Sequence, residues 1–215
     1  RDLHSFPTRR SSDLVVAYLP TYYYYSLTEQ IYTANEMGGE DTEISSVSFF
    51  NTGTSNITRN MSVYMVNTDK TSFGSNTDWI PVTDANLVFS GNVTMTSRSW
   101  VTIYFNTPFD YDGESNVALI VDDNSYSYNS YTSCRTFDTE ENQALRIYSY
   151  STNYDPYAPN NYTGTLMSEK NQVIFGIPSY EFTLTVSAIP EEGGTVSGAN
   201  GGLYFEMKNG TLTKT

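Results

Sequence analysis

The sequence predicts an all-β protein whose strands form two stacked sheets. Short runs of β-branched and aromatic residues recur along the chain, and clusters of Asn, Asp, Gly, Ser and Thr separate them. Within the runs, apolar and polar residues alternate with a period of two, which is typical of strands that have one buried face and one wetter face. Several such strands in one stretch of chain favour a sandwich, in which the inner faces of two sheets bury each other.

Seven runs carry the pattern and define the predicted strands, which span residues 44–50, 61–66, 87–89, 100–105, 117–121, 144–148 and 172–177. In the second run Met61, Val63 and Met65 share one face, while Ser62 and Tyr64 lie on the other. Turns are expected at 37–39, 51–53, 90–92 and 112–113, where Gly, Asn and Asp permit tight reversals. Residues 26–37 are the one plausible helix, but their β-prone centre favours a mostly extended segment.

Both ends of the chain differ from this central region. Residues 1–14, RDLHSFPTRRSSDL, resemble the codon-by-codon translation of a common sequencing adapter, so we expect an artefact without ordered structure. After Pro178 a new strand pattern begins, followed by a turn rich in Pro, Gly and acidic residues. A segment this short cannot bury a core of its own, so residues 179–215 are predicted to be the truncated start of a second β-module, after a sandwich domain at 15–178.

Charge and residue usage exclude several function classes. The chain has 11 basic and 24 acidic residues, a formal net charge of −13, which argues against nucleic-acid binding because phosphates need a basic surface. The single histidine, His4, lies in the adapter-like segment, and Cys134 is the one cysteine. Catalytic triads and zinc sites need imidazole or several thiolates, so we expect no such chemistry. Cys134 is expected to pack as a small apolar residue.

Residues 15–178 resemble a known group of modules. The stretches YSLTEQIYTANEMGGEDTEISSVSFFNTG, WVTIYFNTPFDYDGESNVALIVDDNS and NQALRIYS are similar to jelly-roll domains of surface and secreted Bacteroidetes proteins, such as the cleaved-adhesin domains that accompany gingipain-type proteases. The tail EFTLTVSAIPEEGGTVSGANG resembles the start of a small all-β repeat of bacterial surface proteins. The resemblance implies a jelly-roll sandwich, an extracellular or outer-surface location, and an adhesin, glycan-binding or accessory role.

An acidic turn is the first candidate site. Asp110, Asp112 and Glu114 alternate within one turn, and Asp122 and Asp123 follow the next predicted strand. Ca²⁺ takes six to eight oxygen ligands, at about 2.3–2.6 Å, and alternate turn residues can aim carboxylates at one point. Asp110, Asp112 and Glu114 are therefore candidate ligands of a structural calcium ion. The alternative interpretation is an ordinary turn with solvated acids.

Aromatic residues in turn-rich segments are the second candidate. Sugar rings stack on aromatic side chains, and Trp79, Tyr126 and Tyr128 are the predicted ligand-binding residues. Trp79 is expected to be exposed, because Asp78 and Pro81 suggest a loop. The alternative is that the tyrosines reflect ordinary strand composition. Glycoside hydrolysis needs two carboxylates, one with a raised pKa, and no acid shows the apolar sequence neighbours that would raise its pKa.

Together these observations predict a non-catalytic extracellular module that binds a glycan or a surface protein of a host or neighbouring cell, without inserting into a membrane. The alternative function is a structural spacer or accessory domain of a larger secreted protease or glycosidase. The sequence identifies neither the ligand nor the oligomeric state.

Overall fold

A computed structural model describes residues 23–127, 133–178, 205–208 and 211–214. The chain divides into two compact units, Arg1–Pro178 and Ser179–Thr215. In the second unit, β12 (Phe205–Lys208) and β13 (Thr211–Lys214) form an antiparallel hairpin. The adapter-like residues 1–14, and Tyr128, lie outside the described residues. Among the residues described, no helix has the length and apolar character that spanning a bilayer requires.

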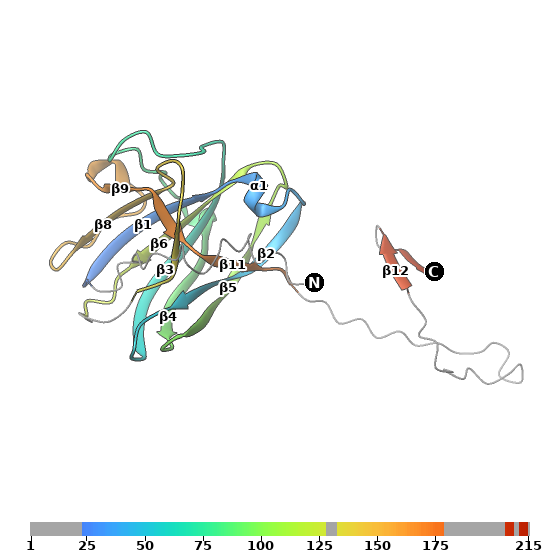
Figure 1. Cartoon of the computed structure of the whole chain (residues 1–215), viewed down its shortest axis with the longest axis horizontal. Helices are drawn as coiled ribbons and strands as arrows, with labels where there is room; N and C mark the ends of the chain where they lie inside the picture. Colours follow the sequence, from blue (N-terminus) through green and yellow to red (C-terminus); the bar gives the residue numbers. More distant parts are fainter. Residues whose placement is uncertain (1–22, 128–132, 179–204, 209–210, 215) are drawn as a thin grey trace, which may run out of the picture. The chain divides into compact units, whose positions relative to one another are not determined.

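The first unit contains two main antiparallel sheets (Figure 1). The larger sheet has six strands, in the spatial order β4 (Leu87–Met95), β3 (Ile57–Thr68), β6 (Asn116–Asp123), β1 (Tyr25–Tyr32), β8 (Ala144–Ser149) and β9 (Thr165–Met167). The smaller sheet has the order β11 (Val173–Gly176), β2 (Thr42–Asn51) and β5 (Ser99–Tyr111). A short ladder pairs β7 (Thr136–Asp138) with β10 (Glu169–Asn171). The prediction of an all-β sandwich is confirmed.

A single apolar core joins the two sheets, and the alternation predicted for the strands produces it. The six-stranded sheet contributes Met61, Val63 and Met65 from β3, all at most 1% exposed, and the three-stranded sheet contributes Val47 and Phe49 from β2. The alternate residues of β5 point to solvent, and Tyr104 is 74% exposed. Cys134 is fully buried in this core, and burial raises its thiol pKa to about 12, as expected for a small apolar residue.

Much of the outer face of the six-stranded sheet is also buried, which corrects the expectation of a wetter face there; the expectation holds along β4 and the start of β3, where Asn60 and Asn92 are exposed. Tyr64, on the face opposite Met61, is 4% exposed. Two segments, residues 69–86 and 150–164, cover this face and add Phe73, Trp79 and Tyr154 to a second core. These segments are tied together, since the Gly164 amide donates to the Asn76 carbonyl at 2.7 Å. Alternation along a strand indicates which residues share a face of the sheet, but it does not indicate which other segments cover that face.

Two local predictions are modified by the structure. Residues 90–92 form no turn, because they lie within β4, where Gly91 is opposite Met61 and the ring of Phe89 packs above the space a Cβ would occupy. Residues 26–37 are mostly extended, as predicted, but the segment ends in one helical turn, α1 (Ala34–Met37). Thr33 and Glu36 form a capping box there, and Gly38 ends the turn in the left-handed region with φ 84°. The 3₁₀ turns η1 (Asp84–Asn86) and η2 (Pro159–Asn161) lie in the covering segments.

Candidate functional site

Six tyrosines gather at the end of the six-stranded sheet where β1 begins and where β6 and β8 end; this tyrosine cluster consists of Tyr23, Tyr24, Tyr25, Tyr126, Tyr148 and Tyr150. The rings of Tyr23 and Tyr148 are stacked, with centroids 3.8 Å apart and planes inclined by 15°. Tyr24 contacts both Tyr126 and Tyr150, at 5.2 and 5.7 Å between centroids. The cluster therefore forms a continuous aromatic surface.

Half of these rings are well exposed. The exposed fractions are 70% for Tyr126, 49% for Tyr150 and 39% for Tyr148. Tyr126 also has a left-handed backbone, with φ 47°, which costs free energy in a residue that is not glycine. Its amide donates to the Tyr24 carbonyl at 3.0 Å, which fixes that conformation. Tyr126 therefore exposes a large aromatic ring to solvent at a position where the backbone conformation is unfavourable for any residue with a Cβ.

A buried arginine fixes the two segments that carry the cluster. Arg59, 1% exposed on β3, forms an ion pair with Asp123 at the end of β6, with Nε and Oδ2 2.8 Å apart. Its two terminal nitrogens donate to the carbonyls of Tyr23 and Ser127, both at 2.5 Å. One guanidinium therefore joins the segment before β1 to the segment after β6.

Asp123 completes this attachment from the opposite side. Its Oδ1 accepts from the amide of Ser125 at 3.0 Å and from the Ser125 hydroxyl. The Ser125 hydroxyl oxygen in turn accepts from the Asn60 amide at 2.8 Å. Burial raises the pKa of Asp123, whereas Arg59 and Ser125 stabilise its charged form and oppose that rise. These bonds restrict the loop that presents Tyr126.

The prediction that Trp79 is exposed is wrong. Trp79 is 3% exposed in the second core, and its indole Nε1 donates to the Tyr162 carbonyl at 2.9 Å. The Asp78 and Pro81 neighbours did indicate a loop, but this loop lies flat against the outer face of the six-stranded sheet. A large aromatic ring in such a segment provides most of the apolar area that holds the segment down. Trp79 is therefore a packing residue and offers no face to a ligand.

Two buried acids also differ from expectation. Burial raises the pKa of Glu29 to about 8 and that of Asp122 to about 7. Their carboxylates lie beneath the covering segments, where Glu29 accepts from the Ile80 amide at 2.7 Å and Asp122 from the side chain of Asn124 at 2.6 Å. Sequence neighbours could not reveal these environments, because the apolar groups come from segments far away in the chain.

The acidic turn forms a self-contained cap. Both oxygens of Asp112 accept hydrogen bonds from within the turn, at 2.9 Å from the Glu114 amide and at 2.6 Å from the Ser115 hydroxyl, and these bonds lower its pKa. Gly113 takes the positive φ of 76° predicted for this turn. Within the described ranges, no three His, Cys, Asp or Glu side chains are grouped as a metal site. Calcium binding by Asp110, Asp112 and Glu114 stays a prediction, which melting curves in chelator and then in excess Ca²⁺ would test.

The structure separates the aromatic residues of the loops into two groups. Tyr126 belongs to the exposed cluster, as predicted, whereas Tyr154 is 8% exposed in the second core. Sequence reasoning missed Tyr148 and Tyr150, since Tyr148 ends a predicted strand. The available signal was the Tyr-Ser-Tyr run at residues 148–150, where the predicted strand 144–148 ends.

The tyrosine cluster, its arginine anchor and the buried acids are thus the features of the chain from which a function must be inferred. Comparison of the sequence with protein-family models and with curated proteins, and of the structure with solved structures, gives no match.

Proposed function

We propose that the sandwich domain is a non-catalytic, extracellular binding module and that its ligand is a glycan. The observation that supports this proposal is the exposed tyrosine cluster. Sugar rings present C–H faces that pack on aromatic rings, and phenol hydroxyls at the edge of such a surface can exchange hydrogen bonds with sugar hydroxyls. The 70% exposure of Tyr126 at a left-handed backbone position is difficult to explain by packing, because glycine, which has no Cβ, would relieve the cost.

The rigidity of the cluster supports the same function. Tyrosine has few rotatable bonds, and the stacking of Tyr23 on Tyr148 restricts both rings before any ligand arrives. The bonds from Arg59 fix the backbone on either side of the cluster. A surface organised in advance loses less conformational entropy on binding, which favours the weak contacts that sugars make.

A glycan array probed with the whole chain tests the proposal, and two alanine variants make the test specific. Tyr148→Ala removes a ring from the cluster, whereas Tyr104→Ala removes a more exposed ring from β5 in the other sheet. We expect reproducible binding to a limited set of glycans that Tyr148→Ala abolishes and Tyr104→Ala preserves. Melting temperatures within a few degrees of the wild type would confirm that both variants fold.

Two results would contradict the proposal. An array on which the wild-type chain binds nothing would favour the alternative function, a spacer or accessory domain that positions a neighbouring catalytic domain. Binding that survives Tyr148→Ala but is lost in Tyr104→Ala would place the ligand on the three-stranded sheet instead.

A further inference from the structure

A small polar pocket is lined by residues of β1, β7, β8, β9 and β10, and one of them, Arg146, lies two residues before Tyr148 of the tyrosine cluster. The volume of the pocket is about 20 Å³, enough for a water molecule or one carboxylate oxygen. Among the residues that line it are Thr28, Gln30, Arg146, Glu169, Lys170 and Asn171. Two of these side chains are cationic, so the state of each cation decides what the pocket can bind.

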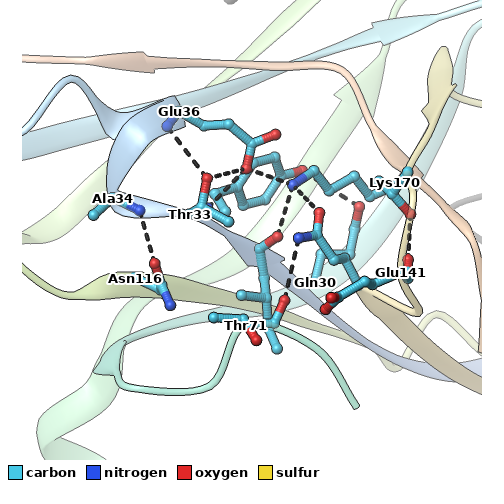
Figure 2. A network of polar contacts seen from close by, with 12 residues as sticks. Gln30, Thr33, Ala34, Glu36, Thr71, Asn116, Glu141 and Lys170 are labelled. Atoms are coloured by element: carbon cyan, nitrogen blue, oxygen red, sulfur yellow. Dashed lines mark hydrogen bonds and ion pairs between the residues drawn. The ribbon is translucent and has the colours of Figure 1, made fainter.

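Lys170 is already fully used. Its ammonium donates to the Ile31 carbonyl at 2.8 Å and to the side chains of Glu36 and Gln143, both at 2.7 Å (Figure 2). An ammonium has three protons, and these three acceptors use all of them. Glu36 also forms an ion pair with Lys170 and so balances the charge of this ammonium, whose side chain is fully buried. Lys170 therefore holds α1 against β10 and has no capacity left for a ligand.

The amides of the pocket are satisfied as well. The side chain of Gln30 donates to Asn171 Oδ1 at 2.9 Å, and its oxygen accepts from the Asn171 amide at 2.6 Å. This closed pair leaves the floor of the pocket with little free hydrogen-bonding capacity.

Arg146 is different. Its Nε atom is buried and has no hydrogen-bond partner, and no carboxylate forms an ion pair with this guanidinium in the part of the chain that the structure describes. Glu169 lines the same pocket but makes no ion pair with Arg146. A buried donor without an acceptor costs free energy, and a charged donor costs more than a neutral one. The guanidinium offers a planar set of donors that matches a carboxylate, which can accept two parallel hydrogen bonds.

The position of Arg146 connects this donor to the cluster. Arg146 and Tyr148 are two residues apart on β8, so their side chains share one face of the strand. The guanidinium carbon lies 5.9 Å from the centre of the Tyr148 ring, and Tyr23 stacks on that same ring. A sugar at the exposed edge of this stack would carry its substituents toward Arg146.

We infer that Arg146 selects an acidic sugar, such as a uronic acid, by donating hydrogen bonds to its carboxylate at this pocket while the tyrosine cluster contacts the ring. This inference rests on the proposed glycan-binding function and names the class of glycan. The net charge of −13 repels polyanions at long range, so any preference for an acidic sugar must come from local contact with Arg146.

Titration calorimetry of the whole chain against matched sugars tests the inference. The probes are oligomers of galacturonic, glucuronic and mannuronic acid, each paired with its methyl ester, which keeps the ring and removes the charge. For at least one pair we expect the free acid to bind about 10- to 100-fold more tightly than the ester, the range expected for one charge-assisted contact. Arg146→Gln should abolish this preference, so that acid and ester bind equally, and Arg146→Lys should retain only part of it. Arg135→Gln is the matched control, because the Arg135 guanidinium lies over the Phe50 ring, 3.9 Å from its centre, and does not line the pocket.

The outcomes separate this inference from the proposed function. Equal affinity for acid and ester, a preference that survives Arg146→Gln, or binding of neutral glycans alone would overturn the role of Arg146 and leave the glycan-binding proposal intact. No binding to any of these sugars, together with a glycan array that shows no binding, would overturn both.

Discussion

The buried carboxyl of Glu29 should make the stability of the domain fall as the pH rises. Glu29 is 1% exposed on β1, and burial raises its pKa from 4.5 to about 8. Between those two values the folded protein keeps the proton while the unfolded chain releases it. The unfolded state therefore binds fewer protons, and the free energy of unfolding decreases with pH across this window. Glu29→Gln keeps an acceptor for the Ile80 amide and removes the titration.

The size of the effect follows from the width of the window. Each pH unit between the unfolded and folded pKa values costs about 1.4 kcal/mol for one group. Between pH 5 and pH 7.5, the free energy of unfolding of Glu29→Gln should therefore gain about 3 kcal/mol relative to that of the wild type. Asp122 titrates in the same direction, with a pKa of about 7, but it is present in both proteins and cancels in the difference.

Urea denaturation at half-unit pH intervals measures this difference. The control is Glu140→Gln, which makes the same substitution at an exposed position of the chain. If the difference between Glu29→Gln and the wild type is flat from pH 5 to pH 7.5, Glu29 is ionised in the folded protein, and the reasoning from burial is refuted.

Three further predictions concern packing and the anchor of the cluster. Arg59→Met leaves Asp123 buried without its partner and should lower the free energy of unfolding by about 3–5 kcal/mol in urea denaturation. The double variant Arg59→Met/Asp123→Asn should recover part of this loss. If the free-energy changes of the two single variants are fully additive, the pairing is contradicted. Trp79→Ala should cost about 3–5 kcal/mol because it empties part of the second core, and a loss below about 1 kcal/mol would mean that this ring is not packed as described. Gly164→Ala should cost about 1–3 kcal/mol, since its Cβ would lie 2.5 Å from Cζ2 of Trp79; this cost should shrink in the Trp79→Ala background, and an unchanged cost there would argue against the contact.

The strands were largely predictable, because each depends on residues that are adjacent in the chain. All seven predicted strands are present, most of them longer than predicted, as in β5, which extends to Tyr111. Within residues 23–178, the missed strands β7, β9 and β10 have only three residues each, too few for alternation to be recognised. Tyr111, the last residue of β5, is buried, and its hydroxyl donates to the Ser115 carbonyl at 3.0 Å.

The candidate site was predictable only in part. Tyr126 could be identified because an aromatic residue among Asn and Ser indicates an exposed loop. The anchor could not, because Arg59 and Asp123 are 64 positions apart and their pairing depends on β3 and β6 being neighbours in the sheet. The same limit applies to Arg146, because the lack of an acceptor for its buried Nε is a property of its surroundings rather than of its sequence neighbours.

The sequence by itself therefore determined that this chain is built from strands and that tyrosines are abundant in its loops, since alternation and turn composition act over a few residues. Only the tertiary structure decided which faces meet solvent. The segments 69–86 and 150–164 cover one face of the larger sheet and bury Trp79, while the ends of β1, β6 and β8 bring six tyrosines together. The physical reason is that burial depends on what packs against a residue, and those contacts are made across the whole chain.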